Sequence, residues 1–427
     1  MKKIAVFGPG PGFKGGIASF SISLAKAFAG MENTETHLIS WTHQYPFFIP
    51  RDFKDDKSQT ELLGKSGVTA HYLLNFNRFL TWKKTYRKIV EINPDFIVFQ
   101  WSNPIQAFPI GYLIRQLKAN TNIRVIADLH FGNRKEYSSI VKKLASYAIK
   151  YADAYVVHSF KTAIEIKELF PEGTFNLTEG DQNTDKGKPL LKLYHPIYDM
   201  YAPDPSFDVA AQKEQLHLKK YVFLFFGFII KYKGLHNAIA AFAELSKMRN
   251  DVSLLIAGES SWQAGKQPKK KRFLRLFSRR LRAWFVSRKE DESNYHPLEM
   301  IDMLGIRDCV TVVNEFVPNE EVHKYYQVSD AIVLFYETGA TASGVESIAY
   351  NFRIPILATR VGHFPETVKD AVTGYLADPD DVMSMTEAMQ ALIEQPPLLE
   401  NLEKVAKAMN WANYARSVCN IASSVRI

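Results

Sequence analysis

The stretch from Asp330 to Ala358 constrains the fold more than any other part of the chain. It begins with an unbroken apolar run, Ala331 to Tyr336, and continues through small residues at 339–344. Helical spacing of apolar residues follows, and then a second apolar run. This order predicts a strand, a tight loop, a helix and a second strand, which together form a βαβ unit of a parallel sheet.

The loop of this unit has the composition of a phosphate-binding turn. A helix that begins near Ser343 directs unpaired backbone N–H groups and the positive end of its dipole towards the loop, and Gly344 leaves room for a diphosphate. Glu337 at the strand end and Glu346 in the first helical turn lie where ligands bind in open parallel sheets, and both can accept hydrogen bonds from sugar hydroxyls. Alternatively, Glu346 only complements the helix dipole and Glu337 is a solvated strand end.

The composition describes an ordinary globular protein with material for two cores. A length of 427 residues favours two domains, and 46% hydrophobic with 23% charged residues argues against disorder. Cys309 and Cys419 are the two cysteines, too few and too far apart for a disulfide framework and compatible with a reducing cytoplasm. The amino-terminal apolar run ends at Phe7, too short for a signal peptide, and the longest run, Tyr221 to Ile230, is too short to span a bilayer.

Alternating strand and helix patterns predict that the first half is one Rossmann-like domain. A glycine-rich turn precedes an amphipathic helix, and its Gly-x-Gly-x-x-Gly pattern is the weak signature of a dinucleotide site. No acidic residue follows the next strand to bind a ribose, which argues against a nicotinamide cofactor. The polar segment 170–189 is predicted to be a surface loop, with a linker near 196–205. Strands are expected at 4–7, 37–41, 95–101, 123–129 and 154–158.

The 330–358 stretch resembles the signature of glycosyltransferase family 4. In that family a strand-end glutamate, a glycine-containing loop, a helix glutamate and a proline-containing strand hold a nucleotide sugar. Seven residues usually separate the two glutamates, whereas eight separate Glu337 from Glu346. Thr338 stands at the family's spacing, so either the loop carries one extra residue or Glu337 is not the family's sugar-contacting glutamate.

A second resemblance lies in the turn after the strand near 221–226. The family's Gly-Arg-x4-Lys-Gly element, whose cations neutralise the donor diphosphate, is matched by Gly227, Lys233 and Gly234. Phe228 stands in place of the arginine. Lys231 is a candidate for the second charge, although an ammonium lacks the bidentate geometry of guanidinium.

The resemblance also implies roles for residues in the first half. Gly15 and Gly16 resemble the family's amino-terminal loop, whose backbone amides face the donor's phosphate and sugar. His130 follows a predicted strand at the place where the family has a histidine that contacts the donor sugar. A tight turn for the glycines and a structural role for the histidine are the alternatives.

The resemblance implies an α/β protein of GT-B architecture, with two Rossmann-like, doubly wound domains facing across a cleft. The expected domains are 1–200 for the acceptor and 206–405 for the nucleotide-sugar donor, with 406–427 as a helix crossing back to the first domain. It implies a retaining, metal-independent glycosyltransferase that needs no cofactor. The sugar would pass from a nucleoside diphosphate to a hydroxyl of a glycan or lipid-linked acceptor, most often in bacterial cell-surface polysaccharide biosynthesis.

An insertion at 261–297 carries much of the net charge of +8. Within it, 269–289 places large aromatic side chains on one helical face and arginines on the other, a pattern typical of a helix lying in an anionic membrane interface. Docking of that face on the domain is the alternative, and nucleic acid is not expected because no recognition module accompanies the basic run. The predicted location is cytoplasmic, peripheral on the inner face of the cytoplasmic membrane.

Two other classes of function remain open from the sequence. The missing arginine and the longer glutamate spacing also suit a nucleotide-sugar-binding partner without catalysis. A nucleotide-sugar isomerase shares the GT-B architecture and would change the donor without an acceptor.

Overall fold

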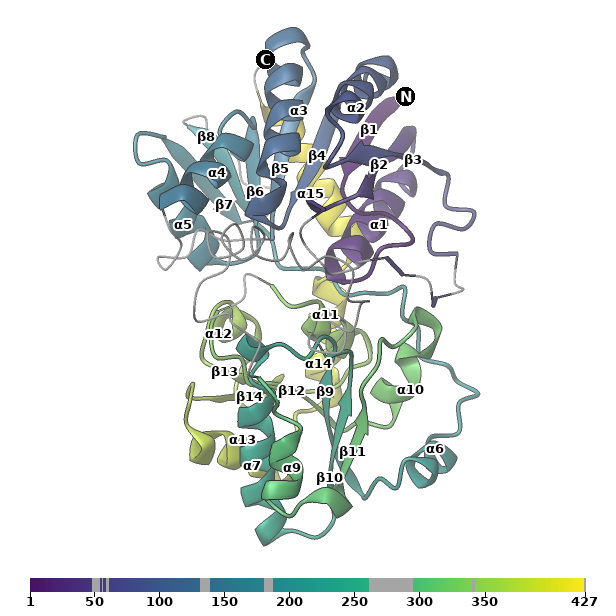
Figure 1. Ribbon diagram of the computed structural model, residues 1–427, viewed down its shortest axis with the longest axis vertical. Helices are drawn as coiled ribbons and strands as arrows, with labels where there is room; N and C mark the ends of the chain where they lie inside the picture. Colours follow the sequence, from purple (N-terminus) through teal and green to yellow (C-terminus); the bar gives the residue numbers. More distant parts are fainter. Residues whose placement is uncertain are drawn as a thin grey trace, which may run out of the picture.

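The computed structural model describes residues 1–47, 54–55, 57–58, 61–130, 139–179, 187–260, 295–339 and 342–425. Two parallel sheets form the described part of the chain, one above the other in Figure 1. The carboxyl ends of their strands face the gap between the two domains. The predicted α/β fold with two Rossmann-like domains is confirmed.

The first sheet has eight strands in the order β3-β2-β1-β4-β5-β6-β8-β7, and all its pairings are parallel. Its central strands are apolar because both faces are covered, as in β4, where every residue is buried. The strands are β1 (Lys2–Phe7), β2 (Thr34–His43), β3 (Val68–Asn75), β4 (Phe96–Trp101), β5 (Arg124–Leu129), β6 (Ala154–Val157), β7 (Phe175–Glu179) and β8 (Lys188–Lys192).

Helices cover both faces of this sheet, and β1 shows how its residues divide between them. Ile4 and Val6 face the core shared with α1 and α15, whereas Ala5 and Phe7 face the core shared with α3. The helices that belong to this domain are α1 (Gly16–Ala29), α2 (Phe79–Ile92), η1 (Pro104–Gln106), α3 (Ala107–Asn120), α4 (Ser139–Ile149), α5 (Phe160–Leu169) and α15 (Trp411–Ser424).

The second sheet has six parallel strands in the order β11-β10-β9-β12-β13-β14. The strands are β9 (Tyr221–Phe226), β10 (Val252–Ala257), β11 (Val310–Val313), β12 (Ala331–Leu334), β13 (Ile356–Thr359) and β14 (Gly374–Ala377). The helices are α6 (Val209–Gln215), η2 (Lys231–Lys233), α7 (Leu235–Met248), α9 (Glu299–Met303), η5 (Arg307–Cys309), η6 (Asn319–Glu321), α10 (Val322–Gln327), α11 (Gly344–Asn351), α12 (Phe364–Thr367), α13 (Val382–Glu394) and α14 (Leu399–Ala408).

One predicted loop contains two strands. The polar segment 170–189 was expected to lie on the surface without regular structure, but β7 forms within it and β8 begins at its end. β7 is the edge strand of the sheet and only partly buried, and β8 lies between it and β6. A partly exposed edge strand tolerates polar residues, which explains why the sequence of β7 lacks an apolar run.

The carboxyl-terminal helix α15 returns to the first domain and fixes the linker beneath it. The indole of Trp411 donates a hydrogen bond to the carbonyl oxygen of Ile197 at 2.6 Å. Further along the helix, the hydroxyl of Tyr414 donates to the buried carboxylate of Asp128 at 2.8 Å. The helix therefore joins the linker, the first sheet and α1.

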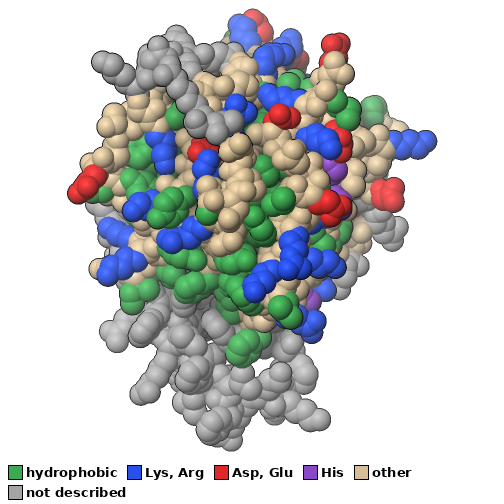
Figure 2. Space-filling model, turned by 90° about the horizontal axis from the view of Figure 1, so that it is seen from above, with side chains coloured by type: hydrophobic (Ala, Val, Ile, Leu, Met, Phe, Trp, Pro, Cys, Tyr) green, Lys and Arg blue, Asp and Glu red, His purple; other side chains and the backbone are tan. Residues whose placement is uncertain are grey.

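The surface at the first-domain end carries Lys and Arg side chains spread among apolar ones (Figure 2). No helix of the described residues is both long enough and apolar enough to cross a bilayer. The predicted insertion helix at 269–289 lies outside the described residues.

Candidate functional site

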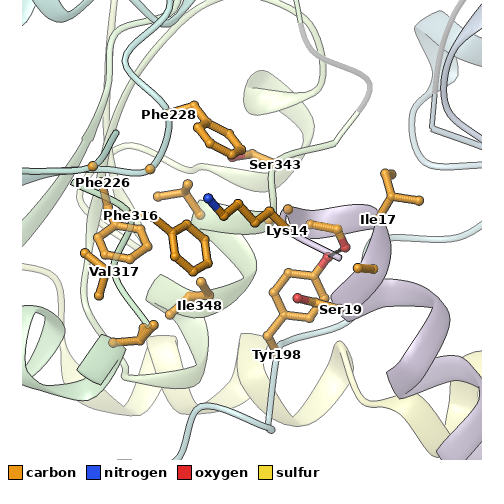
Figure 3. A pocket seen from close by; sticks show the side chains of 18 of the residues that line it. Lys14, Ile17, Ser19, Tyr198, Phe226, Phe228, Phe316, Val317, Ser343 and Ile348 are labelled. Carbon is orange, nitrogen blue, oxygen red and sulfur yellow. Dashed lines mark hydrogen bonds between the residues drawn. The ribbon is translucent and has the colours of Figure 1, made fainter. Parts of the chain in front are cut away.

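A cavity of about 340 Å³ lies between the two domains. Loops from both sheets form its wall, and Figure 3 shows side chains of both domains pointing into it. Because parallel sheets place ligand sites at the carboxyl ends of their strands, this is the position expected for a substrate. Five of the predicted site residues line the cavity: Gly15, Gly16, Lys233, Ser343 and Gly344.

Two helix amino termini meet at this cavity. Helix α1 begins at Gly16 after Gly15, whose φ of 100° favours glycine. Helix α11 begins at Gly344, and the hydroxyl of its N-cap, Ser343, accepts a hydrogen bond from the backbone N–H of Glu346. The first N–H groups of a helix lack partners within it, and they carry the positive end of the dipole. The cavity is therefore suited to an anion.

Tyr198 of the linker lies between these two helices. Its hydroxyl donates a hydrogen bond to the carbonyl oxygen of Gly16 at 2.6 Å. A Cβ added at Gly344 would lie 3.0 Å from its ring, and one added at Gly16 would lie 3.4 Å from its hydroxyl. A side chain at position 344 would thus crowd the Tyr198 ring, whereas the distance at Gly16 is that of an ordinary contact.

Among the described residues of the second domain, Lys233 is the one cationic side chain that lines the cavity. Lys233 is the last residue of the short helix η2. A Cβ added at Gly227 would lie 3.1 Å from the Nζ atom of Lys233. The ammonium therefore lies beside the turn that follows β9. Gly234 after it has a φ of 67° and packs against the carbonyl oxygen of Phe335.

Gly234→Ala tests how tightly this turn is held. A Cβ would lie 1.8 Å from the carbonyl oxygen of Phe335, and a positive φ alone costs alanine about 1–2 kcal/mol. We expect the variant to lose more than about 2 kcal/mol of unfolding free energy, measured by denaturant titration. Gly12→Ala is the control, because its φ is 81° but nothing lies within 4 Å, so it should show only the backbone cost. Equal losses in the two variants would mean that the turn adjusts freely.

Glu337 and Lys231 lie beside the cavity and do not line it. The Glu337 carboxylate pairs with His236 Nε2 at 3.0 Å, and its backbone N–H donates to the carbonyl oxygen of Tyr232. Burial lowers the pKa of His236, Glu337 opposes that shift, and nearby Lys231 adds to it. These three residues thus form one electrostatic group at the side of the cavity.

Glu346 is buried, with 5% of its side chain exposed. One carboxylate oxygen accepts a hydrogen bond from His363 Nε2, and the other, Oε1, has no hydrogen-bond partner among the described residues. The carboxylate borders a second, small cavity of about 10 Å³, which also touches His158 and His195. That volume is about the space for one water molecule.

His130 belongs to a buried cluster at the carboxyl end of β5. Its Nε2–H donates to Gln100 Oε1, and its ring stacks on His158 with a centroid distance of 4.8 Å. Burial lowers the pKa of His130 to about 3, although the nearby Asp128 carboxylate favours the charged form. The imidazole is therefore neutral at physiological pH.

The same cluster includes the described side chains that are close enough to share a metal ion. Atoms of Asp128, His130 and His158 that can bind metals lie within 4.8 Å of one another. His158 Nε2 lies 3.0 Å from Asp128 Oδ1, a close electrostatic contact without hydrogen-bond geometry, and Tyr414 donates a hydrogen bond to the second oxygen of Asp128. These contacts make the three residues part of a buried polar cluster that joins β5, β6 and α15.

Several cavity residues were not singled out from the sequence. Lys14 of the first domain reaches across to Glu259 and the ring of Phe316, and Tyr198 supports both glycine turns. The one feature of the sequence that could have pointed to Lys14 is its position directly before the Gly15-Gly16 pair. Glu259 and Phe316 follow β10 and β11, but nothing in their own sequence pattern marks them.

Two parallel sheets that face each other across a cavity, with helix amino termini at their carboxyl edges, define a protein of the GT-B class. Its second domain, residues 206–409, matches the family described as glycosyl transferases group 1. This confirms the resemblance at the level of group-1 glycosyltransferases, and it does not single out family 4.

Curated relatives match over a limited part of the chain. The D-inositol 3-phosphate glycosyltransferase of Thermobifida fusca is 28% identical over 117 residues, 26% of this chain and 26% of the relative. Its counterpart from Corynebacterium diphtheriae is 29% identical over 120 residues, 28% of this chain and 27% of the relative. The matches thus span about a quarter of these relatives.

Solved structures match over almost the whole chain. Anabaena HepE in complex with UDP-glucose superposes with a TM-score of 0.69 at 14% identity, covering 99% of this chain and 100% of that one. Sucrose-phosphate synthase from Thermosynechococcus elongatus has a TM-score of 0.65 at 16% identity, covering 98% of each chain. At these identities the likeness concerns the fold.

Proposed function

We propose that this protein is a retaining glycosyltransferase that moves a sugar from a nucleoside-diphosphate sugar to a hydroxyl of a glycan or lipid-linked acceptor. The observation that carries the proposal is the interdomain cavity, where the amino termini of α1 and α11 converge with Lys233. The group-1 match over the second domain and the UDP-glucose named for HepE favour a nucleotide sugar as its ligand.

The reaction breaks the bond between the anomeric carbon and the diphosphate oxygen and forms a bond from that carbon to the acceptor oxygen. The acceptor proton passes to the departing diphosphate, so no protein nucleophile and no metal is needed. Positive charge develops on the sugar and negative charge on the diphosphate. Lys233 and the amides at Gly15-Gly16 and Ser343-Gly344 would stabilise the diphosphate.

For Glu346, Glu337 and His130 we propose roles in binding the donor. Glu346 would accept hydrogen bonds from the ribose, and its unpaired Oε1 is a buried acceptor in need of a donor. Glu337 would bind sugar hydroxyls after leaving His236, and His130 would position the sugar as a neutral imidazole.

The test is to incubate the purified protein with a panel of nucleotide sugars and follow nucleoside diphosphate release by mass spectrometry. We expect slow hydrolysis of one donor without acceptor, which would also identify the sugar. Conversion of the donor to an isomeric sugar nucleotide without release would support the isomerase instead. Binding without either reaction, in the presence of lipid-linked and glycan acceptors, would favour the partner without catalysis.

A surface of the first domain favours the proposed location on an anionic membrane, with a role in bacterial cell-surface polysaccharide assembly. The neighbouring helices α2, α3 and α4 carry eight lysines and arginines and one acidic residue, Glu91. Their first turns expose apolar side chains: Phe79 (50%), Leu80 (79%), Phe108 (49%) and Ile140 (42%).

These apolar side chains lie at the cleft edge of the domain, because each helix follows the carboxyl end of a strand. Exposed aromatics together with surrounding cations are typical of contact with a bilayer interface, and each cation near an anionic surface contributes about 1 kcal/mol. A membrane at this edge would present a lipid-linked acceptor to the cleft. The helix predicted at 269–289, within the insertion at 261–297, remains a second proposed contact.

We expect the protein to sediment with phosphatidylglycerol vesicles and not with phosphatidylcholine vesicles. A Phe79→Ser/Leu80→Ser/Phe108→Ser variant should bind at least about 10-fold more weakly, because it loses the apolar area that enters the interface. Met248→Ser/Met303→Ser, which changes exposed apolar residues of the second domain, is the control. Equal binding by both variants would exclude the α2–α4 surface and leave the insertion as the contact.

A further inference from the structure

The proposed diphosphate site has an unmet electrostatic requirement. A nucleoside-diphosphate leaving group carries at least two negative charges, yet among the described residues the second domain contributes only Lys233 to the cavity wall. Phe228 stands in place of the arginine of the Gly-Arg-x4-Lys-Gly element that this turn resembles, and its apolar ring also lines the cavity. A second cation has to come from elsewhere.

Lys14, from the first domain, lines the same cavity as Lys233. It extends from the loop before α1 into the space between Phe228 and Phe316 (Figure 3). Its side chain is only 11% exposed, and its Nζ lies 4.7 Å from the centroid of the Phe316 ring. Long lysine side chains normally keep the ammonium in water, so an ammonium held inside a cavity calls for an anionic partner.

The partner present in the structure is weak for a buried charge. Glu259 Oε2 lies 3.6 Å from the Lys14 ammonium, beyond the distance of a good charge-assisted hydrogen bond. Glu259 directly follows Gly258, which packs against the backbone of Gly227, so it places Lys14 near the turn that holds Lys233. The two ammonium groups thus approach the same turn from opposite domains.

The inference rests on the proposed function and deepens it. We propose that Lys14 supplies the second positive charge to the donor diphosphate and thereby takes over the role of the arginine replaced by Phe228. The ammonium exchanges the single charge of Glu259 for the larger charge of the diphosphate. The loop that carries Lys14 lies beside Phe228, because a Cβ added at the adjacent Gly15 would lie 3.9 Å from the Phe228 ring.

This assignment has a consequence for the two domains. Lys233 belongs to the second domain and Lys14 to the first, so one diphosphate would bind cations of both. Donor binding would then favour the closed arrangement of the cleft, and release of the diphosphate would relax it. An arginine at position 228 would place both charges on the second domain and lack this coupling.

The test measures binding of UDP, GDP, ADP and dTDP, with the matching monophosphates, by calorimetry. We expect Lys14→Met to weaken the preferred diphosphate at least about 10-fold and the monophosphate less than about 3-fold, because the lost charge faces the terminal phosphate. Adding Phe228→Arg to Lys14→Met should restore most of the diphosphate affinity. Lys57→Met, which removes another ion pair across the cleft, to Glu315 at 3.1 Å, should leave affinity unchanged.

Glu259→Gln separates the proposal from a purely structural ion pair. If Lys14 only joined the domains through Glu259, Glu259→Gln would weaken diphosphate binding as much as Lys14→Met does, and the proposal would be wrong. We expect unchanged or tighter binding instead, since the competitor of the diphosphate is removed. If the wild-type protein binds none of the diphosphates, the proposed function itself fails, whereas wild-type binding that Lys14→Met leaves unchanged overturns only the role of Lys14.

Discussion

His130→Ala is expected to reduce sugar transfer at least about 100-fold while nucleoside diphosphate affinity changes less than about 3-fold. The imidazole lies at the carboxyl end of β5, on the first domain, whereas the proposed diphosphate contacts lie at the two glycine turns and the lysines. It should therefore act on the sugar and not on the nucleotide. Turnover measured with the donor found in the panel, together with calorimetric affinity, checks both halves of the prediction.

The control must separate this role from the loss of a buried histidine. His37 is also buried in the first domain, but it pairs with Glu35 and His71 at the far edge of the sheet. His37→Ala should keep full turnover at a temperature where both variants are folded by circular dichroism. Undiminished turnover of His130→Ala would remove His130 from the site.

The strand-loop-helix units that form the cavity could be predicted because their signals are local. An apolar run followed by small residues at 339–344 predicts a buried strand and a phosphate-binding turn without knowledge of the rest of the chain. The structure places β12 and α11 there, with Ser343 as the N-cap. The edge strands β3 and β7 gave no such signal, since partly exposed strands need no continuous apolar run.

Contacts between distant segments could not be predicted from the chain alone. The partner of Glu346 is His363, the partner of Glu337 is His236, and Lys14 reaches Glu259 on the other domain. Each pair depends on how loops of different strands meet after folding, and many exposed carboxylates and cations would have fitted equally well. The sequence therefore indicated which residues have suitable chemistry, and the fold determined which of them come into contact around the cavity.

Lowering the pH from 7.5 to 5.0 is expected to destabilise the first domain by about 2 kcal/mol through His130 alone. In the unfolded chain a histidine takes up a proton below its ordinary pKa of about 6.5, whereas burial lowers the pKa of His130 in the native state to about 3. Between these values the unfolded state binds more protons, so stability falls as the pH falls. The 1.5 pH units from 6.5 to 5.0 correspond to about 2 kcal/mol at 1.36 kcal/mol per unit.

Two other buried groups near His130, His195 and Asp128, act in the same direction or not at all in this window. Burial also lowers the pKa of His195 well below its usual value, so His195 adds to the loss. Burial alone would raise the pKa of Asp128, but His130, His158 and Tyr414 outweigh it and the net shift is downwards. Asp128 is therefore ionised in both states above pH 5 and contributes nothing there.

Urea unfolding followed at pH 7.5 and 5.0 measures the effect. His130→Gln should lose about 2 kcal/mol of the difference between the two pH values, because glutamine cannot take up the proton in the unfolded state. His43→Gln, at an exposed position of the same domain, should leave the difference unchanged. If His130→Gln retains the full wild-type difference, the native imidazole is already protonated near pH 5. It would then meet a bound sugar as a cation rather than as the neutral group inferred from its burial.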